Sequence, residues 1–166
     1  MRLTLLAVGR LRSRPLQTLL DDYRKRLGGK GPGAKGLGRG PLGPLSVKEV
    51  EERRALPASE LKAREGELLL KALPKDARMV ALDEGGRSLD SRAFAQLLGR
   101  WHDEGIAETV FVIGGADGLD EAVTRRAQLL LSLGAMTWPH LLVRLLLAEQ
   151  LYRANAILQG HPYHRD

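Results

Sequence analysis

The last 15 residues of the chain concentrate imidazole, phenol and guanidinium groups. A histidine titrates near neutral pH and can act as a general base, while aromatic rings and guanidinium groups stack on bases and bind phosphates. There is no cysteine, and the histidine spacing does not match a zinc motif, so we expect no metal site. We interpret the group as facing a nucleic-acid substrate. The group comprises Tyr152, Arg153, His161, Tyr163, His164 and Arg165, together with His140 further upstream. A buried or capping role is the alternative for any single histidine.

A second group of candidate residues follows predicted strands. The β-branched run Thr109–Ile113 ends at Gly114 and Gly115, and the run Arg78–Leu82 ends at Asp83. A third short strand, predicted at 135–137, leads into Trp138. Ligands of parallel sheets bind beyond the carboxyl ends of the strands, and glycine lets the backbone approach a ligand closely. The pattern therefore predicts a binding site at these three strand ends; a tight turn without a ligand is the alternative.

Strands and helices alternate along the chain, which predicts an α/β fold with a mostly parallel sheet flanked by helices. At 166 residues we expect one domain, 1–166. The strands are expected at 3–8, 45–50, 78–82 (stopped by residues 83–86), 109–113 and 135–137. The helices are expected from Pro15 to about Leu27, and at 59–73, 90–101, 122–133 and 141–157.

Charge is unevenly distributed along the chain. The net charge is +6, and residues 1–40 carry ten Lys or Arg against two acidic residues. Such an excess is typical of a surface that binds a phosphate backbone, although solubility explains it equally well. Residues 28–44 are rich in glycine and proline, so we expect a flexible basic loop there. No export signal or membrane span is recognisable, which predicts a soluble, cytoplasmic protein.

The predicted last helix is apolar on nearly every side. A helix without a polar face must be buried on more than one side. A symmetric homodimer would cover the second side. The alternative is a central helix within a single domain.

Six groups of residues form a specific set of motifs: 5–9 (LLAVG), 64–66 (REG), 110–115 (VFVIGG) with 118–119 (GL), 136–140 (MTWPH), 149–154 (EQLYRA) and 162–164 (PYH). By these motifs the chain resembles the RlmH family, SPOUT-superfamily methyltransferases that modify N3 of a pseudouridine in helix 69 of bacterial 23S ribosomal RNA. The resemblance runs nearly end to end. It departs at residues 28–44, which are longer than the corresponding family segment and unlike it, and at Gly134, where the family often has serine.

The resemblance implies a deep trefoil knot at the C-terminal end, S-adenosylmethionine as the cofactor, and an obligate homodimer whose active site uses both chains. It also implies that the substrate is the assembled 70S ribosome. By motif, the cofactor contacts fall on Leu82, Gly114, Leu133, Gly134, Ala135, Met136, Thr137 and Trp138. The candidates for catalysis are His161, His164, Arg153 and Tyr163, and those for RNA contact are Tyr152, Arg153, Tyr163, His164 and Arg165.

Methyl transfer to N3 of the base requires alignment of the nitrogen with the methyl group and loss of the N3 proton. His161 or His164 can accept this proton as a general base. Alternatively, the proton is lost before transfer and Arg153 stabilises the anion. Two other functions remain open: a SPOUT enzyme that acts on transfer RNA, and a non-catalytic protein that binds ribosomes or RNA.

Overall fold

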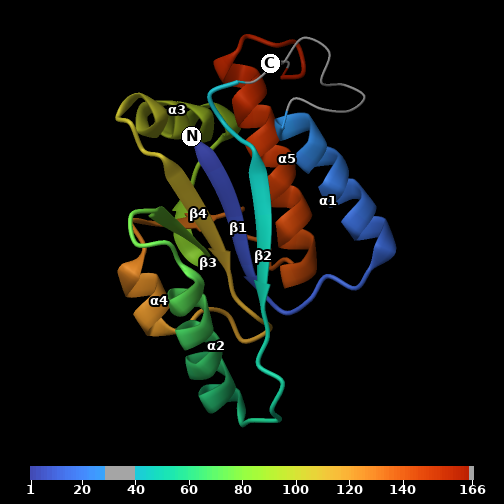
Figure 1. Ribbon diagram of the computed structural model, residues 1–166, viewed down its shortest axis with the longest axis vertical. Coiled ribbons are helices and arrows are strands. Elements are labelled where there is room, and N and C mark those ends of the chain that lie inside the picture. The colour runs from blue at the N-terminus through green and yellow to red at the C-terminus, as the bar shows by residue number, and fades with distance from the viewer. Residues whose placement is uncertain (29–39, 165–166) are drawn as a thin grey trace.

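The computed structural model describes residues 1–28 and 40–164, which form a five-stranded parallel sheet between two layers of helices (Figure 1). The strands are β1 (Arg2–Val8), β2 (Leu45–Val50), β3 (Arg78–Ser88), β4 (Glu108–Ile113) and β5 (Leu129–Ser132), in the spatial order β2-β1-β4-β3-β5. The helices are α1 (Arg14–Leu27), α2 (Ala58–Ala72), α3 (Ser91–Asp103), α4 (Glu121–Arg126) and α5 (His140–Leu158). The predicted α/β class with a parallel sheet is confirmed.

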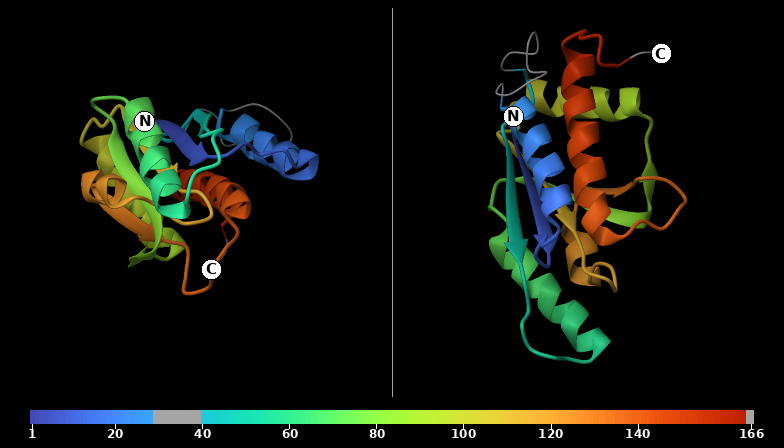
Figure 2. Two further views of the ribbon diagram at one scale, coloured as in Figure 1. Left: turned by 90° about the horizontal axis from the view of Figure 1, so that it is seen from below. Right: turned by 90° about the vertical axis from the view of Figure 1, so that its right-hand side faces the viewer.

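Helices cover both faces of the sheet (Figure 2), and each face carries a separate hydrophobic core. Because side chains alternate along a strand, Leu3 and Leu5 of β1 face the core under α1, α3 and α5. Leu6 and Val8 face the opposite core, under α2 and α4. A parallel strand buried on both faces appears in the sequence as a continuous apolar run, which explains why β1 and β4 were predicted within one residue of their bounds.

The predicted end of β3 at Leu82 is wrong, because the strand continues to Ser88. Its pairing with β5 shifts register between Leu82 and Arg87, so residues 83–86 form an irregular insertion within the strand. A Cβ at Gly86 would lie 2.7 Å from the carbonyl carbon of Leu130. Glycine therefore allows close backbone contact with β5, and the partner strand extends an element that local sequence would stop.

The predicted helix at 122–133 is also wrong beyond Arg126, because β5 replaces its second half. Gln128 donates its backbone N–H to the carbonyl of Met79 at 3.0 Å, and Leu129 pairs with Val80. Pairing with β3 thus overrides the helical preference of a leucine-rich segment. The strand predicted at 135–137 is a loop, in which Met136 is 72% exposed.

The predicted loop at 28–44 lies largely outside the described residues. Its described end, 40–44, contains no helix or strand and is held to the body of the protein. The N-terminal ammonium donates to the carbonyl of Pro41 at 2.7 Å, and the backbone N–H of Leu42 donates to Asn155 Oδ1 at 3.1 Å.

Helix α5 packs between α1 and α3 on one face of the sheet (Figure 1). Leu147, Ala148 and Leu151 are fully buried, whereas Leu142, Leu145 and Leu146 remain half-exposed on the outer side. None of the helices within the described ranges is long and apolar enough to cross a membrane.

Candidate active site

A cavity of about 460 Å³ opens at the carboxyl edge of the sheet. It is formed by the residues that follow Leu82 in β3, by the loop after Ile113 in β4, and by the loop that connects β5 to α5. Its size lies within the range of small-molecule sites. The structure thus brings together the three chain segments that the sequence placed at one site, although the third is a loop after β5 rather than the end of a strand at 135–137.

The loop after β4 is closed tightly through its glycines. A Cβ at Gly114 would lie 2.6 Å from the carbonyl oxygen of Gly118, a distance that real Cβ atoms do not show. Gly118 has φ +78°, in the left-handed region that favours glycine, and its N–H donates to the carbonyl of Gly115 at 3.2 Å. Gly114 and Gly118 are therefore required by the loop itself, and this loop forms one wall of the cavity.

The loop between β5 and α5 forms the opposite wall. Gly134 has φ +116°, and Ser132 Oγ fixes the turn by donating to the Gly134 carbonyl at 3.0 Å and accepting from its N–H at 3.2 Å. Two large apolar side chains, Met136 and Trp138, are 72% and 40% exposed at the rim. Such exposure is unusual for apolar side chains of this size and suits a surface that a ligand covers.

Seven of the eight predicted cofactor residues line this cavity, and Ala135 does not. Ala135 is exposed in the loop after Gly134. The lining residues are Leu82, Gly114, Leu133, Gly134, Met136, Thr137 and Trp138.

Charged residues that the sequence reasoning did not assign to the site also line the cavity. Asp83, Glu84 and Asp117 contribute carboxylates, and Lys62 contributes the ammonium group. Glu65 lies beside Gly115, and burial together with the charge of Asp117 raises its pKa. The signal in the sequence was their position: Asp83 and Glu84 follow the apolar run of β3, and Asp117 lies in the loop after β4. The cavity therefore has an acidic rim.

The start of α5 connects the cavity to the end of β2, at the opposite edge of the sheet. His140 lines the cavity, and burial together with the charge of Arg144 lowers its pKa, which favours a neutral imidazole. One turn later, the fully buried Arg144 pairs with Glu49 at 2.6 Å and donates to the carbonyl oxygens of Val8 and Gly9 at 2.6 and 2.9 Å. No role for Arg144 was predicted from the sequence.

The terminal candidates form a separate cluster around Glu149. Arg153 Nη2 lies 2.5 Å from Glu149 Oε1, and the hydroxyl of Tyr163 donates to the same oxygen at 3.1 Å. The ring of Tyr163 packs edge-on against Tyr152, with centroids 4.6 Å apart. The Arg153 guanidinium lies over the Tyr163 ring. Burial raises the pKa of Tyr163 well above its ordinary value, so its hydroxyl stays protonated and acts as a hydrogen-bond donor. Glu149, the centre of this cluster, was not predicted.

None of the terminal candidates within the described residues lines the cavity. His140 is the first of the 19 residues of α5, and at 1.5 Å per residue the helix is about 28 Å long. The tail follows its other end, where the backbone N–H of Tyr163 donates to His161 Nδ1 at 3.2 Å. Arg165 lies outside the described residues. Within one chain, the cavity and the tail are therefore at opposite ends of α5 (Figure 1).

A second hollow, of about 720 Å³, lies between the cavity and the Glu149 cluster. It shares Gly134 and Trp138 with the cavity and reaches Glu149 on α5. Apolar side chains from α1, α3 and α5 line much of it, including the 48% exposed Leu19. Within the described part of the chain, no group of three or more His, Asp or Glu side chains is placed to hold a metal ion.

Comparisons with known proteins agree on one family. The family model described as "Predicted SPOUT methyltransferase" matches residues 1–164. Proteins named ribosomal RNA large subunit methyltransferase H from Rhodospirillum centenum and Paramagnetospirillum magneticum are 54% and 52% identical to the chain over 165 residues, with 99% of each chain covered.

Two solved structures resemble the fold. A protein described as a probable methyltransferase from Bordetella pertussis Tohama I superposes with a TM-score of 0.53 at 18% identity, covering 92% of this chain and 95% of that one. A protein described as a probable methylase family protein from Haemophilus influenzae Rd KW20 gives a TM-score of 0.51 at 12% identity, covering 99% and 70%. At these identities the likeness concerns the fold alone.

Proposed function

Because the chain belongs to the ribosomal RNA large subunit methyltransferase H family of SPOUT methyltransferases, we propose that it methylates large-subunit ribosomal RNA with S-adenosylmethionine as donor. The finer proposal is transfer to N3 of a pseudouridine in helix 69 of 23S ribosomal RNA, on the assembled 70S ribosome in the cytoplasm. The observation that carries the proposal is the cavity formed by residues 82–84 of β3 and the loops after β4 and β5.

The residues of the cavity fit the donor. Gly134 has no atom within 4 Å of where a Cβ would stand, so its backbone is open to a ligand. Met136 and Trp138 offer apolar surface for an adenine ring, and Asp83, Glu84 and Asp117 offer negative charge to a cationic ligand. When bound, S-adenosylmethionine supplies an electrophilic methyl group on a positively charged sulfur. Leu82, Gly114 and the loop from Leu133 to Trp138 would hold it; Ala135 would contribute only if the loop moved.

The terminal residues would act on the RNA. Arg153 carries the positive charge needed to stabilise a base that has lost its N3 proton, and Glu149 fixes its position. His161 or His164 would accept that proton. Tyr163 is unsuited as a base because its pKa is raised, and it would instead donate a hydrogen bond to Glu149 or, with Tyr152, contact the nucleotide.

The separation of cavity and tail supports a site shared between two chains. Reacting atoms must approach to about 3 to 3.5 Å, yet His161 and His164 follow the end of α5 that is remote from the cavity. In a symmetric homodimer, the tail of one chain would reach the cavity of the other. The half-exposed Leu142, Leu145 and Leu146 would pack in that interface. We also propose that the C-terminal part of the chain forms the deep trefoil knot that the resemblance implies.

The test is methylation of ribosomes isolated from cells that lack the endogenous enzyme. With labelled S-adenosylmethionine, we expect one methyl group per 23S ribosomal RNA, mapped by mass spectrometry to a pseudouridine in helix 69. Modification of another nucleotide of 23S ribosomal RNA would overturn the finer proposal, and absence of methyl transfer to ribosomal RNA would overturn the function itself.

A further inference from the structure

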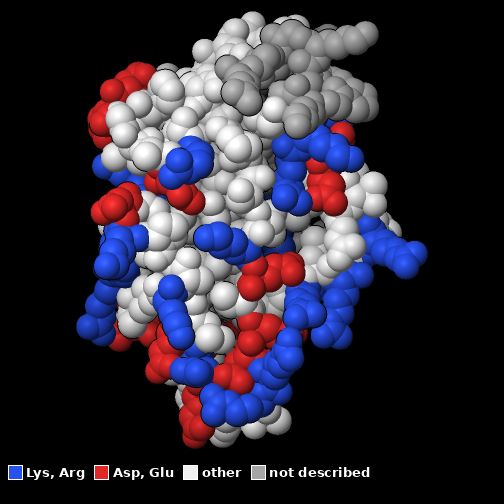
Figure 3. Space-filling view, in the orientation of Figure 1, with Lys and Arg blue, Asp and Glu red and all other residues white. Residues whose placement is uncertain are grey.

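Four arginines stand at the ends of β1 and β2, outside the candidate active site. Arg10 and Arg12 follow β1, and Arg53 and Arg54 follow β2. The two strands are parallel neighbours, so these residues share the edge of the sheet at which the cavity opens. We call these four residues the arginine edge. The side chains of Arg10, Arg12 and Arg54 are 56%, 81% and 63% exposed. In Figure 3, Lys and Arg side chains at the lower end of the face are interleaved with Asp and Glu.

Glu51 pairs with two members of the arginine edge. One oxygen of Glu51 lies 3.4 Å from Arg10 Nε, and the other lies 3.6 Å from Arg12 Nη2. Exposed pairs of this kind contribute little to stability. Their effect here is to hold two guanidinium groups on either side of one carboxylate while leaving other N–H groups of each directed to solvent.

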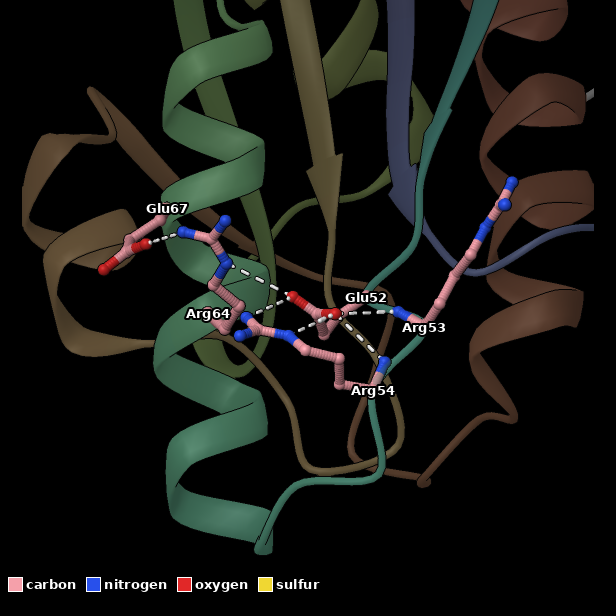
Figure 4. Close-up of polar contacts among 5 residues, drawn as sticks. All are labelled: Glu52, Arg53, Arg54, Arg64 and Glu67. Atoms are coloured by element: carbon pink, nitrogen blue, oxygen red, sulfur yellow. Dashed lines mark hydrogen bonds and ion pairs between the residues drawn. The ribbon is translucent and has the colours of Figure 1, made fainter.

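Glu52 fixes the other half of the arginine edge. It lies 3.0 Å from Arg54 Nη2 and 3.2 Å from Arg64 Nε, and it accepts the backbone N–H groups of Arg53 and Arg54 at 2.9 and 3.0 Å (Figure 4). The Arg53 side chain points away from these ion pairs and has no carboxylate partner among the described residues (Figure 4). The guanidinium of Arg53 is therefore free to bind an anion.

The arginine edge is held rigidly to the cavity. Glu49, which pairs with Arg144 of α5, also accepts the backbone N–H of Leu11 at 2.8 Å. Gly9 donates to the carbonyl of Val50 at 2.8 Å. The segment that carries Arg10 and Arg12 is thus tied to the helix whose first residue, His140, lines the cavity.

The cavity rim and the arginine edge differ in charge. Asp83, Glu84 and Asp117 at the cavity repel phosphate, whereas guanidinium groups bind phosphate oxygens through paired N–H donors. An RNA strand that delivers a nucleotide to the cavity therefore meets repulsion at the rim and attraction at the neighbouring ends of β1 and β2. We propose that the arginine edge binds the backbone phosphates of RNA that flank the methylated nucleotide. The identity of the ligand as RNA rests on the proposed function.

The test compares the wild type with the triple variant Arg12→Ala, Arg53→Ala, Arg54→Ala in ribosome methylation at several salt concentrations. Arg100→Ala is the matched control, since Arg100 is an exposed arginine in the last turn of α3, near the opposite edge of the sheet. For the triple variant we expect KM for ribosomes to rise about tenfold near 0.15 M salt, and the slope of log(1/KM) against log salt to become about 2 to 3 units shallower. We expect kcat to remain within about twofold and the control to match the wild type.

The single variant Arg53→Ala separates RNA binding from any loss of folding. Arg53→Ala removes a guanidinium that has no ion-pair partner in the described structure, and we expect the slope to become about 0.7 to 0.9 units shallower. If the wild type methylates ribosomes and both variants keep its KM and its slope, the arginine edge has no part in RNA binding. If the wild type transfers no methyl group, the proposed function fails. Filter binding of the same ribosomes at the same salt concentrations then tests the arginine edge by itself, with the same slopes expected.

Discussion

Arg144 Nη1 lies 2.6 Å from Glu49 Oε1, and this ion pair fixes the first turn of α5 to the end of β2. The Arg144 side chain is fully buried, whereas that of Glu49 is 31% exposed. Burial lowers the pKa of Arg144 and Glu49 opposes this shift, and arginine remains charged in proteins. The position of His140 at the cavity therefore depends on a buried charge that needs its counter-charge.

Glu49→Gln leaves the Arg144 guanidinium buried without an opposite charge. Breaking a fully buried pair in this way costs about 3 to 5 kcal/mol, and because Glu49 is partly exposed we expect about 2 to 3 kcal/mol. The measurement is the free energy of unfolding in urea. Glu51→Gln, which removes only the exposed pairs with Arg10 and Arg12, should cost less than about 1 kcal/mol. Equal stabilities of the two variants would show that Arg144 does not depend on Glu49.

Gly134→Ala tests the wall of the cavity. Its φ of +116° is strained for alanine, at a cost of about 1 to 2 kcal/mol, and no atom lies within 4 Å of the added Cβ. Gly105→Ala is the matched control, because Gly105 has φ +78° and equally open space but lies in the turn between α3 and β4. We expect calorimetry to show at least about tenfold weaker binding of S-adenosylmethionine for Gly134→Ala and unchanged binding for the control. Equal affinities in the two variants would remove Gly134 from the binding site.

Acid should erase the effect of Glu52→Gln on stability. The hydrogen bond with Arg54, together with those to the Arg54 backbone and to Arg64, lowers the pKa of Glu52 from 4.5 to about 2. Because the pKa is lowered in the folded state, the stabilisation by ionised Glu52 is complete above pH 4.5 and is lost as the pH falls from 4.5 toward 2. The two unfolding curves, measured in urea across this range, should therefore converge. A difference that stays constant with pH would mean that ionisation of Glu52 is not its source.

Mixed dimers test whether the active site uses two chains. Gly114→Ala disrupts the cavity and His164→Ala disrupts the tail, and we expect each homodimer to have little activity, with S-adenosylmethionine binding intact in His164→Ala. When equal amounts of the two variants exchange subunits at random, half the dimers are mixed, and one of the two sites in each mixed dimer is intact. Activity should then recover to about a quarter of the wild-type value. Failure to recover, with exchange verified by mass spectrometry, would place cavity and tail of each site in one chain.

The sequence predicted the strands that are buried on both faces, because such strands need no partner to be recognised. Residues 3–8 and 109–113 are continuous apolar runs bounded by glycine or charge. By contrast, β5 has only four residues, Leu129–Ser132, and its leucines suit a helix as well as a strand. Only the pairing with β3 decides between the two structures, and a long-range pairing is not encoded in local periodicity.

The candidate site also contains residues that the sequence could predict and residues that it could not. Gly114 was recognisable because a glycine directly after a strand reflects a backbone requirement, whereas Gly134 was predicted only through the resemblance to the family. Arg144 and Glu149 were not, because a charged residue in an apolar helix has the same sequence pattern whether it is buried or exposed. Their roles depend on Glu49 and Tyr163, which lie 95 and 14 residues away along the chain.

The most direct test of the central claim is a crystal structure of the protein grown with S-adenosylmethionine. We predict that the donor lies in the cavity formed by residues 82–84 of β3 and the loops after β4 and β5, in contact with Leu82, Gly114 and the loop that holds Gly134 and Met136. A donor bound elsewhere, or an empty cavity at millimolar donor in a lattice that leaves it open, would contradict the assignment of this cavity as the methyl-donor site.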